Sequence, residues 1–230
     1  MTDWERLADW WLGEVEADPA YETDVVPLLR DTFAAPSGVV LDAGCGDGRI
    51  AGVLAERSVI GCDISAALLD HARHRAPVVR SRLPSLAWLQ SRVLAGIVAV
   101  LVTEHVPDIA SFFGEAARVT EVGGTMTVVM NHPAYTAPTS GPVVDQSDGE
   151  VLWRWGPYFD AQPTQVPAGS GTVTFHHRQM STILNAAAAA GWSLEVMDER
   201  PLGTESIAGH PGLVGQEHFP RLLGLRWRNT

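Results

Sequence analysis

One short glycine-rich segment constrains this chain more than any other feature. The apolar run Val39–Leu41 leads into the sequence Asp-Ala-Gly-Cys-Gly-Asp-Gly, and a helix-like segment follows over 48–57. Glycine permits the positive φ of a tight turn and lets a ligand approach the backbone. The first N–H groups of the following helix have no partner within that helix. A strand, a glycine turn and a helix in this order predict a nucleotide-binding loop.

The rest of the chain alternates strand-like and helix-like segments, which favours a parallel sheet with helices on both faces. Strands are predicted over 39–41, 59–62, 77–80, 95–102, 125–130, 192–197 and 222–227. Helices are predicted over 4–15, 20–33, 48–57, 65–75, 108–120 and 179–190, with Asp18-Pro19 and Gly191 as breaks. Residues 131–175 interrupt this alternation, and 163–171 is expected to be a loop.

The length of 230 residues fits a single domain over 1–230. Within it we expect an N-terminal helical cap over 1–36, a cofactor-binding core over 37–130, a substrate lid over 131–175, and a C-terminal helix and strands over 176–230. The first residues lack the pattern of a signal peptide, and no apolar run is long enough to span a bilayer. We therefore expect a cytoplasmic protein, in which Cys45 and Cys62 are free buried thiols.

Charge narrows the range of partners. The formal net charge is −11, and the chain has sixteen basic residues, all of them arginine. An acidic chain repels phosphate backbones and anionic lipids, so neither nucleic acid nor a membrane is expected as a partner. The absence of lysine excludes a P-loop. No cluster of Cys and His has zinc-like spacing, so no metal is predicted.

Asp63 ends the second predicted strand, where an acidic side chain can accept hydrogen bonds from ribose hydroxyls. The alternative is a solvated carboxylate that caps the next helix. A dinucleotide fingerprint needs a third glycine, and Arg49 occupies that position. Asp42 precedes the loop and disfavours a pyrophosphate. S-adenosylmethionine (SAM) carries an ammonium and a sulfonium in place of phosphates, and suits an acidic loop.

These segments resemble class I SAM-dependent methyltransferases of the small-molecule branch. VLDAGCGDGRIA is similar to motif I of that family and VIGCDIS to its second motif, and RVTEVGGT, HHRQM and AGW are similar to later segments. The resemblance covers roughly 37–228. It implies a Rossmann-like α/β fold with a seven-stranded sheet of order 3-2-1-4-5-7-6. Strand 7, for which 222–227 is the candidate, would be antiparallel.

The resemblance also implies which residues bind SAM. It assigns Asp42, Gly44 and Gly46 to the methionine end and Asp63 to the ribose. The acid that often binds adenine is missing before Leu83-Pro84, and Gly96 stands where an acid often begins the fourth strand. Backbone groups near Arg80 and Ser81 are the expected adenine contacts. Cys45, Ile64 and Thr103 complete the predicted cofactor set.

Two polar segments follow the fourth and fifth predicted strands, at the edge where ligands bind in open α/β sheets. They nominate His105 and His132 as general bases, with His132 favoured. The alternative is that each histidine binds a loop backbone group. Glu104 is expected to bind polar substrate or to fix a histidine. His177 is a weaker candidate, expected to cap its helix or to order the lid.

Aromatic side chains gather in the two segments outside the sheet pattern. They supply contact area for an organic ligand, although ordinary packing accounts for most tryptophans taken singly. The predicted substrate-contacting residues are Trp11, Tyr21, Glu104, Tyr135, Trp153, Trp155, Tyr158 and His177.

The sequence therefore predicts methyl transfer from SAM to an oxygen or nitrogen of a small organic acceptor, with secondary metabolism as the expected setting. S-adenosyl-L-homocysteine (SAH) is the expected product. The main alternative is a SAM-binding pericyclase, decarboxylase or sensor that transfers no methyl group. A macromolecular methyltransferase is less favoured, although 131–135 superficially resembles the Asn-Pro-Pro-Tyr motif of DNA adenine methyltransferases. Arg49 disfavours a dinucleotide-dependent oxidoreductase. No oligomeric state is predicted.

Overall fold

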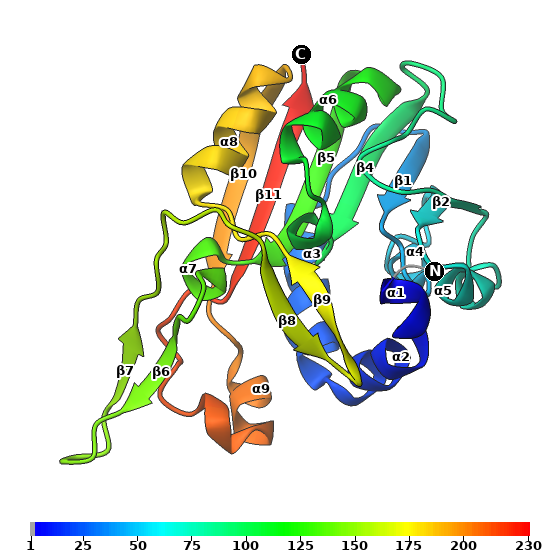
Figure 1. Ribbon diagram of the computed structural model, residues 1–230. Helices are drawn as coiled ribbons and strands as arrows, with labels where there is room; N and C mark the ends of the chain where they lie inside the picture. The colour runs from blue at the N-terminus through cyan, green and yellow to red at the C-terminus, as the bar shows by residue number, and fades with distance from the viewer. Residues whose placement is uncertain (1–2) are drawn as a thin grey trace.

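A computed structural model describes residues 3–230. Its centre is a seven-stranded sheet in which β11 is antiparallel to both of its neighbours (Figure 1). The strands, in spatial order, are β3 (Val78–Arg80), β2 (Ser58–Asp63), β1 (Val39–Ala43), β4 (Leu94–Val100), β5 (Thr120–Asn131), β11 (Leu222–Asn229) and β10 (Trp192–Arg200). Counted along the sheet, this is the predicted order 3-2-1-4-5-7-6. The predicted fold is confirmed.

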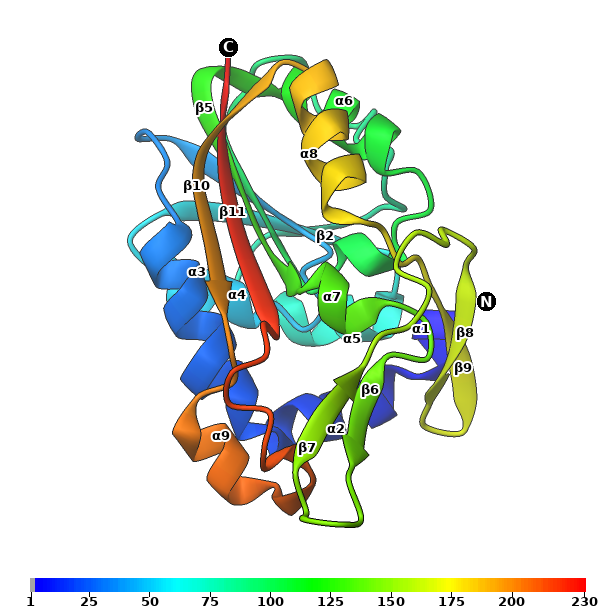
Figure 2. The same ribbon diagram turned by 90° about the vertical axis from the view of Figure 1, so that its left-hand side faces the viewer.

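Helices cover both faces of the sheet (Figure 2). One face carries α6 (Ile109–Val119) and α8 (Met180–Ala189), and the other carries α3 (Val26–Thr32) and α4 (Arg49–Val53). α5 (Ala66–Ala72) packs on β2 and β3. Ser65 caps α5, because its hydroxyl accepts a hydrogen bond from the Leu68 N–H. α6 is capped in the same way by Asp108.

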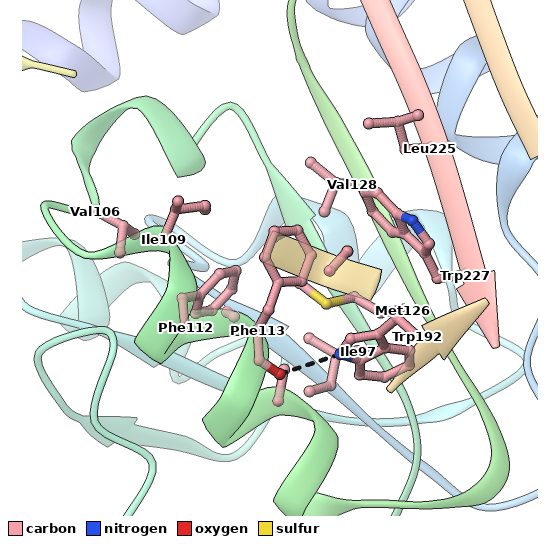
Figure 3. Packing of buried hydrophobic residues seen from close by; sticks show 14 of the residues in the cluster. Ile97, Val106, Ile109, Phe112, Phe113, Met126, Val128, Trp192, Leu225 and Trp227 are labelled. Atoms are coloured by element: carbon pink, nitrogen blue, oxygen red, sulfur yellow. Dashed lines mark hydrogen bonds between the residues drawn. The ribbon is translucent and has the colours of Figure 1, made fainter. Parts of the chain in front are cut away.

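The larger core cluster lies between the sheet and the face formed by α6 and α8 (Figure 3). Apolar residues recur along α6 at helical spacing, which buries Phe112 and Phe113 against the sheet. The rings of Phe113 and Trp227 meet edge to face, 5.3 Å apart. The indole N–H of Trp192 donates to the Phe113 carbonyl at 3.1 Å, so this buried polar group is satisfied. The core thus fixes the strands whose carboxyl ends carry the site.

The N-terminal segment differs from the prediction in detail. The helix predicted over 4–15 is two helices, α1 (Asp3–Arg6) and α2 (Ala8–Ala17), which meet at Leu7. Leu7 is buried against Ala168 and Val173, and this packing outside the helix accounts for the bend. The second predicted helix begins as a π-helical turn, η1 (Tyr21–Val25), and continues as α3.

Residues 131–175 form regular structure that the sequence analysis did not predict. They contain α7 (Pro133–Thr136) and two hairpins, β6 (Gly141–Val144) with β7 (Val151–Arg154), and β8 (Thr164–Ala168) with β9 (Gly171–Phe175). The loop predicted over 163–171 is therefore wrong. A two-residue turn joins β8 to β9, and its first residue, Gly169, has φ +54°. In Figure 1 the β8–β9 hairpin lies beside α1 and α2, whereas β6–β7 projects at the lower left.

Three further short helices complete the described chain, namely η2 (Thr103–His105), α9 (Thr204–Gly209) and η3 (Pro211–Leu213). Both cysteines are buried and free, as predicted. Within residues 3–230, none of the helices has the length and apolar character needed to cross a membrane.

Candidate cofactor and active site

A cavity of about 330 Å³ opens at the carboxyl ends of β1 and β4. The N-terminal helices and the β8–β9 hairpin contribute to its walls. The predicted site residues that line it are Trp11, Tyr21, Asp42, Gly44, Cys45, Gly46, Asp63, Ile64, Ser81 and His105. The fold thus brings together most of the predicted cofactor set, two of the predicted substrate residues and one of the two candidate bases.

The glycine loop between β1 and α4 forms the floor of this cavity. Gly44 and Gly46 have φ values of +77° and +53°, which side chains rarely adopt. A Cβ on Gly44 would lie 2.2 Å from Cγ2 of Val102, so this glycine lets the loop pack against the end of β4. A Cβ on Gly46 would instead face open space, with the Trp11 indole nitrogen as the nearest atom at 3.8 Å. The backbone at Gly46 is therefore open to a ligand.

Asp42 is the most unusual group in the cavity. Its side chain is 1% exposed, and no partner within residues 3–230 forms a hydrogen bond with its Oδ2 atom. Burial, reinforced by the negative charges of Asp63 and Asp47, raises the pKa of Asp42 to about 8. A buried carboxylate without a partner is costly, and a bound cation would relieve that cost. Asp42 therefore marks a place for a positively charged ligand.

Asp63 connects the end of β2 to the glycine loop. Its Oδ2 accepts a hydrogen bond from the Gly46 N–H at 3.0 Å, and its Oδ1 accepts one from the Ser65 N–H at 2.8 Å. Burial raises the pKa of this carboxyl. Asp63 thus supports the start of α5 and also lines the cavity, so the two readings of this residue are compatible.

Arg49 occupies the position that a third glycine takes in a dinucleotide fingerprint. It forms an ion pair with Asp47 at 3.0 Å, and its guanidinium lies 4.9 Å from the centroid of the Tyr21 ring. All three side chains line the cavity. The Arg49 side chain thus stands where a dinucleotide-binding fold has a glycine, which permits close contact between helix and strand.

Two members of the predicted cofactor set lie outside the cavity wall. Arg80 donates to the Ile64 carbonyl at 3.0 Å and to Glu5 at 3.2 Å, so it braces the loop after β2. Thr103 is buried and donates to Glu104 at 3.1 Å.

His105 lies at the cavity wall, in η2 after β4. Its Nδ1 atom is 3.2 Å from the Thr174 carbonyl oxygen, which can only accept a hydrogen bond. The neutral ring therefore carries its proton on Nδ1 and a lone pair on Nε2. The ring is held edge-on by Trp4, with centroids 4.9 Å apart, and by Phe175 at 5.6 Å.

His132 has both ring nitrogens engaged and does not line the cavity. Its Nδ1 accepts from the Ala134 N–H at 3.0 Å and so caps α7. Its Nε2 is therefore the protonated nitrogen, and donates to Glu199 at 2.7 Å. His177 is also buried outside the cavity wall, and its Nε2 and Nδ1 contact the Tyr158 carbonyl and the Thr136 hydroxyl.

The remaining predicted substrate residues also lie away from the cavity wall. Glu104 is buried, and its Oε1 accepts hydrogen bonds from the backbone and side-chain N–H groups of Asn131. It therefore joins the end of β4 to the end of β5. Trp153 and Trp155 contact Phe219, and Tyr135 contacts Trp153. The hydroxyl of Tyr158 accepts from the Met180 N–H at 2.9 Å.

Several cavity-lining residues were not predicted. They are Trp4, Val15, Asp47, Arg49, Ile50, Leu68, Arg82, Leu83, Val100, Leu101, Val102, Val106, Pro107, Val173, Thr174 and His176. Leu101 and Val102 could have been found, because they end a predicted strand at the ligand-binding edge. Val173 and Thr174 could not, because their strand was not recognised.

Comparisons with known proteins agree with this geometry. A family model described as a methyltransferase domain matches residues 41–128. An S-adenosylmethionine-dependent methyltransferase of known structure from Mesorhizobium loti has a TM-score of 0.75 and 26% identity, over 88% of this chain and 96% of that one. The chain belongs to the class I SAM-dependent methyltransferases.

Two curated relatives match this chain over different lengths. A trans-aconitate 2-methyltransferase from Methylobacterium radiotolerans is 27% identical to this methyltransferase, over 84% of this chain and 78% of the relative. A ubiquinone biosynthesis O-methyltransferase from Hahella chejuensis is 30% identical over 51% of this chain, and that match spans 54% of the relative.

The cavity fits the cofactor of this family. SAM carries positive charge at its methionine end, and the Asp42 carboxylate has an oxygen with no partner among the described residues. The open backbone at Gly46 and the carboxylate of Asp63 lie in the same cavity. We therefore propose that Asp42 and the glycine loop bind the methionine end of SAM and that Asp63 binds its ribose.

The open face of Gly46 leads to a direct test. In Gly46→Val a branched side chain would enter the cavity, so we expect a calorimetric titration with SAM to show no binding. Gly123→Val is the matched control, because Gly123 also has positive φ and open space around its Cβ position but lies away from the cavity. We expect the control to share the backbone strain and to keep binding. Normal SAM binding by a folded Gly46→Val variant would contradict this placement of the loop.

Proposed function

We propose that this methyltransferase transfers the methyl group of SAM to an oxygen or nitrogen of a small organic acceptor, with His105 as the general base. The observation that carries the proposal is the presence of Asp42 and His105 in the wall of one cavity. Asp42 offers a carboxylate for a cationic donor. His105 offers an imidazole nitrogen that can receive a proton.

When bound, SAM supplies an electrophilic methyl group on a sulfonium. The residues of this chain bind and align the reactants, because methyl transfer needs an in-line approach at close distance. The Thr174 carbonyl holds His105 in the tautomer whose Nε2 can accept a proton from an acceptor hydroxyl. Trp4, Trp11 and Tyr21 supply apolar walls that exclude water.

The relative from Hahella chejuensis is named as an O-methyltransferase, which favours oxygen as the acceptor atom. The sequence analysis favoured His132 as the base, but both nitrogens of that ring are engaged outside the cavity wall. His105 is therefore the better candidate. We propose His132 as a capping residue of α7.

Incubation with methyl-labelled SAM and a panel of small hydroxyl, carboxyl and amine compounds tests this function. We expect mass spectrometry to find labelled methyl in an acceptor, together with an equal amount of SAH. A second candidate, a SAM-binding protein that transfers no methyl group, predicts bound SAM and no labelled product with any compound of the panel. That result would contradict the proposed function.

The lining of the cavity supports a smaller substrate lid than the sequence predicted. Trp4, Trp11, Val173 and Thr174 line the cavity, and they belong to the N-terminal helices and to β9. We expect SAH to slow amide hydrogen exchange in α1, α2 and the β8–β9 hairpin, because ordering these walls stabilises their hydrogen bonds. The β6–β7 hairpin is the internal control and should change less. Equal exchange with and without SAH in α1, α2 and β9 would leave these elements as fixed packing.

A further inference from the structure

Arg221 lies directly before β11, at the same edge of the sheet as the cavity. Its backbone is fixed, because its N–H donates to the Arg200 carbonyl and its own carbonyl accepts from the His132 N–H. Its guanidinium carbon lies 3.2 Å from the centroid of the Tyr135 ring. Within residues 3–230, no oxygen accepts a hydrogen bond from this guanidinium.

Other partly buried arginines of this chain are satisfied by several oxygens. Arg178 donates to the carbonyls of η2 and its neighbours, and Arg118 pairs with Glu115 and donates to two carbonyls. Burial lowers the pKa of Arg221 to about 10, and the negative charge of Asp18 opposes that shift only in part. The side chain is still charged at neutral pH, so Arg221 is a sheltered cation without a bonded anion.

A second unsatisfied donor lies in the same cluster. The indole Nε1 of Trp153 is buried, and no group among the described residues accepts its proton. The Trp153 ring stacks on Phe219 at 3.8 Å and lies 5.8 Å from the Tyr135 ring. In Figures 1 and 2 the red connection that leads into β11 passes beside the β6–β7 hairpin. Two donors that lack acceptors therefore border the ring of Tyr135.

The position of this cluster suits one end of an acceptor molecule. β11 is two strands from β4 in the sheet, and neighbouring strands are about 5 Å apart. Arg221 is therefore roughly 10 Å from the end of β4, a distance that a small organic molecule can span. Leu222, the next residue, belongs to the same apolar cluster as the cavity residues Tyr21 and Val15. The residue next to Arg221 thus packs in the same core cluster as two residues of the cavity wall.

The cofactor cavity and the surroundings of Arg221 also differ in charge. The carboxyl groups of Asp42, Asp47 and Asp63 line the cofactor cavity, and they disfavour an anionic group beside them. Arg221, outside the cavity lining, would attract such a group.

We propose that Arg221, with Trp153 and Tyr135, forms the subsite that receives a carboxylate of the acceptor. The inference rests on the proposed function and narrows its substrate class to organic acids. A carboxylate fits better than a phosphate, because one guanidinium balances one negative charge. The negative charge of Asp18 also acts on Arg221, and it would oppose a second negative charge on the ligand.

The test uses the full chain saturated with SAH and titrated by calorimetry. The probes are benzoate, succinate and tricarballylate, each matched with its neutral amide. We expect at least one acid to bind, and its amide to bind at least about 10-fold more weakly. Arg221→Gln should weaken binding of that acid by about 10- to 100-fold, the usual effect of losing a charge-assisted hydrogen bond. Arg221→Lys keeps the positive charge, so its affinity for the acid should lie between those of the wild type and Arg221→Gln.

Arg73→Gln is the matched control, because it removes the same charge from an exposed helix and should leave binding of the acid unchanged. SAH affinity should stay within about twofold in all variants, since Arg221 does not line the cofactor cavity. Equal binding of acids and amides, no binding of any acid, or wild-type affinity in Arg221→Gln would overturn the subsite. Absence of SAH binding in the wild-type protein would instead overturn the proposed function on which the subsite depends.

Discussion

Replacement of His105 by asparagine should slow methyl transfer to a hydroxyl acceptor by about 10²- to 10⁴-fold, the usual cost of losing a general base. Asparagine can still donate to the Thr174 carbonyl, so the loop after β4 should keep its position. It offers no basic nitrogen at the cavity wall. The measurement is single-turnover transfer with saturating SAM, from pH 6 to 9. The variant should be slower than the wild type across this whole range.

His132→Asn is the matched control for this experiment. Its ring caps α7 and pairs with Glu199, so the substitution should lower stability by about 0.5–2 kcal/mol, as loss of a helix cap does. The folded fraction should transfer methyl at nearly the wild-type rate. If instead His132→Asn loses the rate and His105→Asn keeps it, the base has been assigned to the wrong histidine.

Replacement of Asp42 by asparagine should weaken SAM binding and stabilise the cofactor-free protein at pH 8. Asp42 offers a charge-assisted contact to the cationic end of SAM, and loss of such a contact costs about 1.5–3 kcal/mol, or about 10- to 100-fold in affinity. The stabilisation has a separate origin. Without SAM, the buried carboxylate of Asp42 has an oxygen with no partner among residues 3–230. Asparagine removes the buried charge at this position, so the cofactor-free variant should be more stable than the wild type at pH 8.

The pH dependence of stability identifies this group. Burial and the neighbouring charges raise the pKa of Asp42 from 3.8 to about 8 in the folded protein. Between these values the folded state holds a proton that the unfolded state has lost, so Asp42 lowers the free energy of unfolding by about 1.4 kcal/mol for each rise of one pH unit. Below pH 4 and above pH 8 both states carry the same charge, and the slope disappears.

Urea unfolding at several pH values checks this account. The stability of Asp42→Asn relative to the wild type should increase from pH 5 to pH 8. Asp70→Asn, at an exposed ion pair with Arg73, is the control and should show no such trend. A constant difference between Asp42→Asn and the wild type over this range would mean that Asp42 has an ordinary pKa.

The sequence predicted the sheet and the cofactor loop because both depend on local patterns. The continuous apolar run of β4 and the glycines after β1 have few alternative structures. Asp63 could be placed because it ends a strand next to that loop in the sheet. The strand order came from the family resemblance and not from periodicity.

The walls of the site were harder to predict because they depend on contacts between distant segments. β8 and β9 alternate only weakly between polar and apolar residues, and their hairpin gains its packing from Leu7 and Trp10. The roles of the histidines depend on partners far away in sequence, such as Glu199 for His132 and Thr174 for His105. The unpaired state of Arg221 is likewise visible only in three dimensions.

The central claim is that the cavity at the end of β1 binds SAM and no dinucleotide. Calorimetric titration of the wild-type protein with SAM, SAH, NAD and NADP tests it most directly. We expect SAM and SAH to bind with one molecule per chain, and NAD and NADP to show no binding. Binding of NAD or NADP with no binding of SAM or SAH would contradict the assignment of the site.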